Sequence, residues 1–258
     1  MKASRSLVLL AAVAGLSAAE FANAGTYSND FSAGLNGITL TQDLVPGPSI
    51  NNGSLMLTDA VNSQQNSAYL PDLDPGIAVQ TVRAAMMFST AAGTCCGPTP
   101  PNGPADGVSI TFGQHSGAGT FGEEGPVGFN GLVISLDLWD NEDTEVAPSI
   151  DVRVNGVDVP GGSNTTVSPF TAGQFQLLEL FMDNNGTLDL RLGGQDVFVE
   201  LPTGFVPEVG DRFAFGARTG GANAVQRIDD LAIATIVPEP AAWLLVLCGL
   251  PALLRRGR

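Results

Sequence analysis

The sequence predicts an all-β fold, a sandwich of two antiparallel sheets. Ten short apolar segments are separated by turns rich in Gly, Pro or Asn, and hardly any stretch has the periodicity of an amphipathic helix. Short strands at such regular intervals are typical of a β-sandwich. The predicted strands span 54–58, 79–89, 108–112, 132–139, 150–154, 174–182, 187–192, 196–201, 212–217 and 228–234.

The N-terminal segment 1–24 is expected to be a secretory signal helix. Two basic residues, Lys2 and Arg5, precede a long apolar stretch, which ends in the small-residue triplet A-N-A at Ala24. This order is that of a signal peptide, and no polar face interrupts the apolar run as it would in an amphipathic helix of the domain. We expect signal peptidase to cleave after Ala24, so that the mature chain begins at Gly25.

The segment 93–107 is rich in Gly and Pro and contains two adjacent cysteines. Cys95 and Cys96 cannot connect distant strands, and no C-x-x-C pair that would bind a metal is present. A strained disulfide between these neighbours is expected in an oxidising compartment, with redox or intermolecular roles left open. Asp106 follows in the motif A-D-G at the entrance of a predicted strand, where functional loops gather.

Two glycine-rich segments are expected to form turns rather than sites. The segment 117–122 matches G-x-G-x-x-G, but no helix follows it, and the next residues, Glu123 and Glu124, would repel a phosphate. The only histidine, His115, has no evident acid partner and is expected to be a loop residue. The segment 216–223, G-A-R-T-G-G-A-N, is expected to make a tight turn before the last strand.

The segment 134–145, I-S-L-D-L-W-D-N-E-D-T-E, combines a strand with an acidic loop. Alternate residues of a strand face opposite sides, so Ser135, Asp137 and Trp139 share one face and the leucines between them pack on the other. Residues 140–145 then crowd carboxylates together, and oxygen ligands at this density suit Ca²⁺. The glycine that an EF-hand loop requires is missing, which excludes that motif. The alternative is a solvated acidic turn.

The predicted strands 174–182 and 187–192 form the clearest pair. In both, apolar residues alternate with polar or less apolar ones, which is the pattern of one buried and one wet face. Between them lies Asn184-Asn185-Gly186. Asn and Gly adopt positive φ at little cost, so this tripeptide predicts a hairpin turn.

The C-terminal segment 237–258 begins with V-P-E-P, continues with the apolar stretch 241–254 and ends in a basic cluster. The stretch is shorter than the roughly 20 apolar residues that a full helical span needs, so a short transmembrane helix with cytoplasmic arginines is expected. The motif residues are Val237, Pro238, Glu239 and Pro240, and the cluster includes Arg255 and Arg256.

This tail closely resembles the PEP-CTERM sorting signal. In that family an exosortase, a membrane protease, recognises the tail and removes or exchanges it. The resemblance implies a Gram-negative protein that crosses the inner membrane, is held transiently by the C-terminal helix and reaches the cell envelope, the outer surface or the extracellular matrix.

Residues 25–236 remain as a single domain, long enough for a full core. The chain has 26 acidic and 11 basic residues, and the two ends hold two of the acids and five of the bases, which leaves the domain at −18. Such a charge repels nucleic acid and favours cations. The only lysine of the chain is Lys2, so the domain has none.

Three motifs of the domain resemble those of the legume-type (L-type) lectins, which have the concanavalin A-like jelly-roll fold. These motifs are A-D-G at 105–107, G-L-V-I-S-L-D-L-W-D-N at 131–141 and I-D-V-R-V-N-G at 150–156. The resemblance implies a lectin-like protein that binds a glycan or exopolysaccharide, with calcium as cofactor. The implied sugar-binding residues are Asp106, Trp139 and Asn141, and the implied metal ligands are Asp137, Trp139, Asn141 and Glu145.

The chain departs from this family at Ser135, where the lectins have a glutamate that binds a transition metal. A calcium ion without a neighbouring transition metal is therefore expected. Laminarinase-type glycosidases share the fold and carry E-x-D-x-x-E, which corresponds here to Ser135, Asp137 and Asp140. Retaining hydrolysis needs two carboxyl groups about 5 Å apart, so the serine argues against an enzyme. The remaining alternative is a structural matrix or adhesion protein that binds no sugar.

Overall fold

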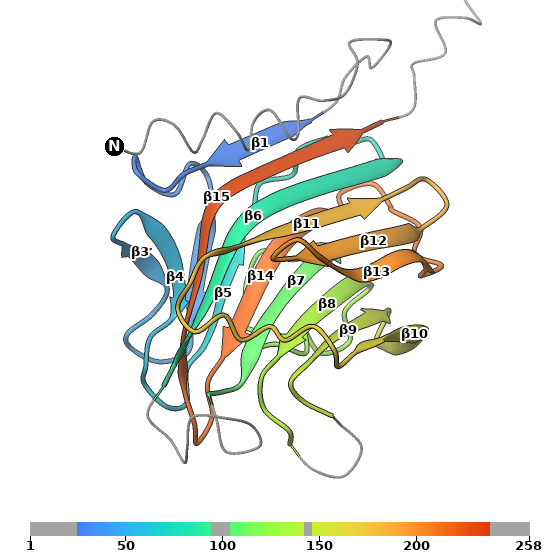
Figure 1. Ribbon diagram of the computed structural model, residues 1–258. Helices are drawn as coiled ribbons and strands as arrows, with labels where there is room; N and C mark the ends of the chain where they lie inside the picture. The colour runs from blue at the N-terminus through green and yellow to red at the C-terminus, as the bar shows by residue number, and fades with distance from the viewer. Residues whose placement is uncertain (1–24, 94–103, 142–145, 238–258) are drawn as a thin grey trace, which may run out of the picture.

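The computed structural model describes residues 25–93, 104–141 and 146–237. Across these ranges the chain forms fifteen β-strands in two antiparallel sheets, which confirms the predicted all-β sandwich (Figure 1). The signal peptide, the two cysteines, Glu145 and the tail beyond Val237 lie outside the described residues. No helix in the described ranges is long and apolar enough to cross a membrane.

The two sheets stack face to face and are built mostly from strands that are distant in sequence. We call the two sheets the back sheet and the front sheet, names that do not refer to the view in Figure 1. The back sheet consists of β13 (Gln195–Pro202), β12 (Thr187–Leu192), β11 (Gln176–Met182), β6 (Thr81–Ala92), β15 (Ala224–Ile236), β4 (Ser54–Thr58) and β3 (Ser49–Asn51), with β1 (Thr26–Asn29) paired to β15. The front sheet consists of β10 (Val157–Asn164), β9 (Ser149–Val154), β8 (Gly131–Asp137), β7 (Gly107–Gly113), β14 (Arg212–Arg218), β5 (Gln65–Tyr69) and β2 (Thr39–Gln42).

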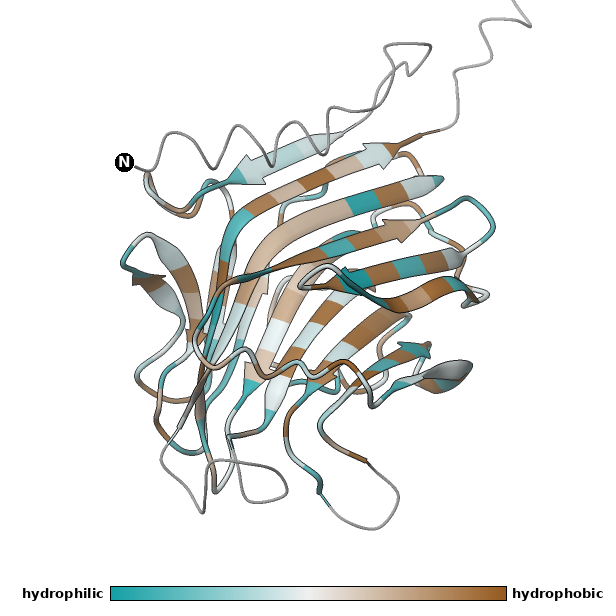
Figure 2. Cartoon of the chain, viewed as in Figure 1, coloured by the Kyte–Doolittle hydropathy of each residue, from teal (hydrophilic) through white to brown (hydrophobic). Residues whose placement is uncertain are grey.

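The hydrophobic core fills the space between the sheets. Phe88 and Met86 of β6 meet it from the back sheet, and Ile134, Leu136 and Phe215 meet it from the front sheet. Hydrophobic and hydrophilic residues alternate along β11 to β13 (Figure 2), as the period of two requires for strands with one wet face. Burial of this continuous apolar layer is the main contribution to stability.

All ten predicted strands are present, and β4 and β12 have the predicted bounds. The observed β8 ends at Asp137, two residues earlier than predicted, so Trp139 lies just beyond the sheet. Five strands are not predicted by the sequence: β1, β2, β3, β5 and β10. The first four are only three to five residues long, and β10 contains the sequence P-G-G, which is unusual in a strand.

The predicted hairpin turn connects β11 to β12. The main-chain N–H of Asp183 donates to the carbonyl of Thr187 over 3.0 Å, and Gly186 has a φ of 74°. The carboxylate of Asp183 accepts hydrogen bonds from the N–H groups of Asn185 and Thr187. The side chain therefore closes the turn that Asn and Gly make accessible.

The segment 114–130 folds over the outer face of the front sheet. The hydroxyl of Ser109 on β7 donates to the carbonyl of Gly122 over 2.6 Å. Phe121 packs on Tyr69 and Ala214, in a second, smaller apolar cluster. The sequence that matches G-x-G-x-x-G thus belongs to a cover of the sheet. As a result, all residues of β7 and β8 are buried, on both faces.

Candidate functional site

Three neighbouring strands of the front sheet, β8, β7 and β14, each have one end at the same side of the sheet. Gly107, the first residue of β7, pairs with Asp137, the last of β8, and with Arg218, the last of β14. The segments that precede β7 and follow β8 and β14 therefore leave the sheet side by side. Loops distant in sequence are brought together at this side of the sheet, which is a common location for binding sites.

A cleft with a cavity of about 290 Å³ opens between these loops. It is lined by Asp106, Trp139, Asn141, Arg218, Gly220, Gly221 and Ala222. The three residues that the sequence proposes for sugar binding, Asp106, Trp139 and Asn141, thus face one cavity, although they come from two different loops. Asp137 does not line the cavity and is 1 % exposed. Glu145 is outside the described residues.

Asp106 is fixed through both its main chain and its side chain. Its N–H donates to the carbonyl of Arg218 over 2.9 Å, and its carbonyl accepts from the N–H of Leu138 over 2.8 Å. The peptide bond between Ala105 and Asp106 is cis. The carboxylate Oδ2 accepts a hydrogen bond from Nε of Arg218 over 2.6 Å. This side chain is 4 % exposed.

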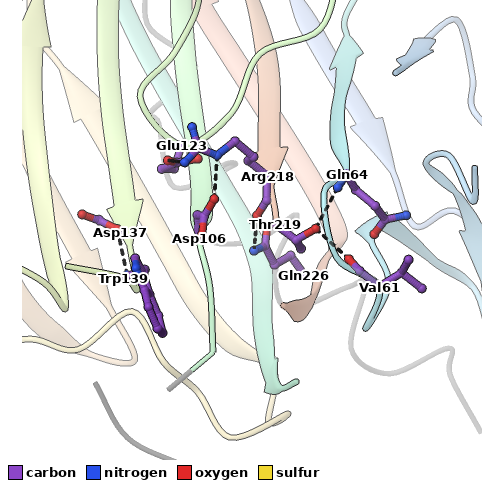
Figure 3. A network of polar contacts seen from close by, with 9 residues as sticks. All are labelled: Val61, Gln64, Asp106, Glu123, Asp137, Trp139, Arg218, Thr219 and Gln226. Atoms are coloured by element: carbon purple, nitrogen blue, oxygen red, sulfur yellow. Dashed lines mark hydrogen bonds and ion pairs between the residues drawn. The ribbon is translucent and has the colours of Figure 1, made fainter. Parts of the chain in front are cut away.

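Arg218 contacts two carboxylates at once, as Figure 3 shows. Besides Asp106, its Nη2 lies 3.7 Å from Oε1 of Glu123, a side chain with 1 % exposure. The stem of Arg218 passes beneath Gly122, where an added Cβ would lie 2.8 Å from the Cβ of Arg218. A side chain at position 122 would therefore collide with Arg218. The single guanidinium offsets the burial of two neighbouring negative charges, which would otherwise repel each other.

Asp137 and Trp139 form the opposite side of the site (Figure 3). Oδ1 of Asp137 accepts a hydrogen bond from the main-chain N–H of Trp139 over 3.0 Å, which fixes the start of the loop. Trp139 is half-buried, and Asn141 is exposed. An aromatic ring and an amide are thereby held at the mouth of the cleft.

The end of β8 and the loop after it carry oxygen atoms of the type that a hard cation prefers. A buried carboxylate, a main-chain carbonyl at Trp139 and a side-chain amide at Asn141 offer only oxygen to a metal, the preference of Ca²⁺. No group of three or more His, Cys, Asp or Glu side chains within the described ranges is arranged to hold a metal ion.

The back wall of the cleft is the turn between β14 and β15. The N–H of Gly220 donates to the carbonyl of Ala222 over 3.0 Å, which confirms the predicted turn. Thr219 anchors it, because its hydroxyl donates to the carbonyl of Val61 over 2.7 Å and accepts from the N–H of Gln64 over 2.9 Å. A Cβ on Gly220 would lie 3.1 Å from both carboxylate oxygens of Asp106. The turn that the sequence predicts is therefore present, and three of its residues, Gly220, Gly221 and Ala222, also line the cleft.

Sequence reasoning misses Arg218 and Glu123 as site residues. Neither belongs to a local motif, since they meet Asp106 only through the pairing of β14 with β7 and the fold of segment 114–130. The available signal is composition: the domain has six arginines, and one of them, Arg218, lies at the end of a predicted strand inside the segment 216–223.

No protein-family model matches the sequence, and a comparison with curated proteins finds no relative. Solved structures are similar to this chain, however. The exoplasmic/lumenal domain of VIP36 in its Ca²⁺/Man2-bound form has a TM-score of 0.59 and 17 % identity, over 84 % of this chain and 89 % of that chain. The chain has the same fold as this domain.

Two plant proteins give the same result. The lectin from Bauhinia forficata in complex with GalNAc has a TM-score of 0.58 and 16 % identity, over 82 % of this chain and 98 % of that chain. The basic winged bean lectin with Tn-antigen has a TM-score of 0.60 and 18 % identity, over 83 % and 99 %. The predicted concanavalin A-like sandwich is therefore confirmed. Within this sandwich fold, the cleft lies between the loops at one end of strands β7, β8 and β14 of the front sheet.

Proposed function

We propose that the protein is a secreted carbohydrate-binding protein whose glycan or exopolysaccharide site is the cleft between the loops. The observation that carries this proposal is that Asp106, Trp139 and Asn141 line one cavity. Structures with the same fold include VIP36 in a Man3GlcNAc-bound form and the Bauhinia lectin with GalNAc, which supports a sugar as the ligand.

The chemistry of the cleft suits a sugar. Vicinal hydroxyl groups both donate and accept hydrogen bonds, and the cleft offers the carboxylate of Asp106, the guanidinium of Arg218 and the amide of Asn141. The ring of Trp139 offers an apolar surface for the C–H face of a pyranose. The charge of −18 on the domain opposes polyanions, so we propose a neutral glycan.

Calcium is the proposed cofactor. Asp137, the carbonyl of Trp139, Asn141 and Glu145 would hold it, with oxygen as the only ligand type. A bound Ca²⁺ would neutralise the acidic loop after β8 and fix the orientation of Trp139 and Asn141 toward the cleft. VIP36 has been solved in Ca²⁺-bound and metal-free forms, which supports a calcium site in this fold.

The proposed function is binding without hydrolysis. Ser135, at the position of the glycosidase nucleophile, is 1 % exposed and does not line the cleft. A hydroxyl there, shielded from the cavity, cannot provide the second carboxyl group that retaining hydrolysis requires.

Sorting by exosortase to the envelope or matrix is part of the proposal, and the placement of the domain ends would then set the direction in which the cleft faces. Strand β15 starts two residues after Ala222 of the cleft and leads to Val237, where the tail begins. At about 3.3 Å per residue the strand is roughly 40 Å long. Figure 1 shows the end of β15 at the top and the turn before it at the bottom. An anchor at the tail would leave the cleft facing away from the membrane.

A glycan array, run with calcium and with chelator, tests the proposal. Asn141→Ala is the preferred variant because Asn141 is exposed, so the fold should survive. Asp196→Asn is the matched control on the back sheet, where the side chain is 61 % exposed. We expect wild type and the control to bind one neutral glycan in calcium, and Asn141→Ala to bind it about tenfold or more weakly, since a lost polar contact in a binding site costs about 1–3 kcal/mol.

Two outcomes of this experiment would contradict the proposal. If no glycan binds in calcium, or if a folded Asn141→Ala variant binds as well as wild type, the cleft is not a sugar site. The protein is then a structural matrix or adhesion protein with a lectin-like fold.

A further inference from the structure

Gly25, the first described residue, is held by side chains of two distant segments. Its N–H donates to Oδ1 of Asp74 over 3.1 Å. Its carbonyl accepts from the N–H of Thr235 over 2.9 Å and lies 3.1 Å from the hydroxyl of the same residue. The Thr235 hydroxyl is also hydrogen-bonded to the second carboxylate oxygen of Asp74.

This position has no room for a side chain. A Cβ on Gly25 would lie 2.7 Å from the carbonyl oxygen of Leu73, 2.8 Å from Oδ2 of Asp74 and 2.9 Å from Oγ1 of Thr235. Asp74 and Thr235 are 8 % and 2 % exposed. Polar atoms of Leu73, Asp74 and Thr235 therefore surround the backbone of Gly25, with Asp74 at its nitrogen, and we call this group of three residues the polar socket.

Asp74 is a buried acidic residue. Among the described residues, no arginine or histidine forms an ion pair with its carboxylate. The main-chain N–H of Asp74 is itself bonded to the carboxylate of Asp72, so a second negative charge lies close by. A buried carboxylate is costly unless a charge or several hydrogen bonds offset its desolvation.

We propose that the socket is a binding site for the α-ammonium group that appears when the Ala24–Gly25 bond is cleaved. Hydrolysis of this bond adds the hydroxyl of water to the Ala24 carbonyl carbon and the remaining proton of water to the Gly25 nitrogen, and the new amine then takes up a second proton, equivalent to the one that the new Ala24 carboxyl group releases. The neutral amide N–H thereby becomes an ammonium with three donors and a positive charge, placed on Asp74. The inference rests on the signal-peptide cleavage of the proposed function and is independent of sugar binding.

The consequence is that processing completes the fold. Before cleavage, Asp74 receives one hydrogen bond from a neutral amide of Gly25. After cleavage it receives a charge-assisted one, which is stronger. The exported chain is then more stable than its precursor, and strand β1 is fixed to β15 at the edge of the back sheet.

The lysine-free sequence makes a direct test available. Lys2 is removed with the signal peptide, so the Gly25 α-amine is the only primary amine of the processed chain. The protein is purified from the envelope of its host, and N-terminal sequencing must give Gly25. It is then treated with an amine-acetylating reagent, natively and in denaturant, and the modification rate is followed by intact mass.

We expect acetylation of native wild type to be about tenfold or more slower than in denaturant, because a paired ammonium has less reactive free amine and each pKa unit changes that fraction tenfold. Asp74→Asn should restore most of the rate while Asp196→Asn should not. If Asp74→Asn does not fold, Thr235→Val, which keeps the shape of the side chain, should still accelerate the reaction.

Three results would overturn the inference. The first is an N-terminus other than Gly25, which also contradicts the predicted cleavage. The second is equal acetylation rates in native and denatured wild type. The third is a folded Asp74→Asn variant whose amine remains as protected as that of wild type. Glycan binding by the same preparation tests the proposed function separately.

Discussion

At the scale of single residues, the cleft depends on one arginine between two buried carboxylates. Arg218 is the only cation that lines the cavity within the described chain, and it holds Asp106 through Nε. From the sequence, Asp106 is a loop residue whose replacement should spare the fold. The structure corrects this expectation, because the side chain is 4 % exposed and ion-paired.

Variants of Arg218 separate charge from geometry. Arg218→Met leaves Asp106 and Glu123 without their cation, so we expect a loss of about 1–3 kcal/mol in the free energy of unfolding, less than for a fully buried pair because the arginine is 38 % exposed. Arg218→Lys keeps the charge but loses the planar fork, so it should retain most of the stability and lose glycan affinity. Urea denaturation and calorimetric titration measure the two effects. Equal stability of Arg218→Met and wild type would contradict the ion-pair argument.

His115 provides a pH-dependent contribution to stability. Burial, together with the positive charge of Arg212, lowers the pKa of His115 to about 4. Its ring stacks on Phe129 at 4.4 Å, and its Nε2 lies 2.9 Å from the hydroxyl of Thr111. The folded state thus binds the histidine proton less tightly than the unfolded state. This contribution is present above pH 6.5, the ordinary pKa, and is lost as the pH falls toward 4.

We expect this linkage to reduce the free energy of unfolding by up to about 3 kcal/mol between these pH values. His115→Phe keeps an aromatic ring in the stack and should flatten the slope. Urea denaturation at several pH values measures it. The comparison with the variant also removes the opposite effect of Asp211, whose pKa is raised by burial. Identical slopes for the two proteins would show that His115 does not titrate in this way.

At the scale of elements, the sequence predicts strands where one face is apolar and fails where buried residues are polar. The pattern Leu-Glu-Leu-Phe-Met is sufficient to predict β11 as a strand, because its buried residues recur with a period of two. In β5, Asn66 and Ser67 are fully buried. The side-chain amide of Asn66 donates to the carbonyl of Leu57, and the hydroxyl of Ser67 accepts from the N–H of Phe121, contacts that depend on the tertiary structure. The local sequence therefore does not predict this strand.

The loop after β8 is the element that calcium should stabilise. Asp137 closes its start by accepting from the N–H of Trp139, and the acidic residues that follow repel one another unless they are neutralised. We expect Ca²⁺ to raise the melting temperature and chelator to lower it, through preferential binding to the folded state. Asp137→Asn should remove most of the difference. Melting curves that are identical in calcium and chelator would assign this loop to the solvated acidic turn.

At the scale of the whole molecule, the strand pattern predicts the sandwich, and the resemblance to the L-type lectins implies that Asp106, Trp139 and Asn141 belong to one site. Arg218 and Glu123 are not predicted as part of it, because the sequence contains no signal for the pairing of β14 with β7 or for the segment that covers the front sheet. The same limit applies at the opposite end of the molecule. The socket around Gly25 depends on Thr235, which lies 210 residues away along the chain.

The structure also changes how the tail should be removed to test sorting. Val237, the first residue of the V-P-E-P motif, is 4 % exposed and belongs to the hydrophobic core. Deleting 237–258 would remove a buried side chain worth about 1.5–3 kcal/mol, so a loss of fold could be mistaken for a loss of sorting.

Deleting 238–258 keeps Val237 and removes the remaining motif, the apolar stretch and the arginines. We expect this variant to be exported, to melt like the processed wild type and to appear in the soluble fraction instead of the envelope. Cell fractionation with a melting curve on the released protein measures both properties. A folded variant that stays as cell-associated as the full chain would show that the tail is not the anchor, and the retention would then have to come from the domain itself.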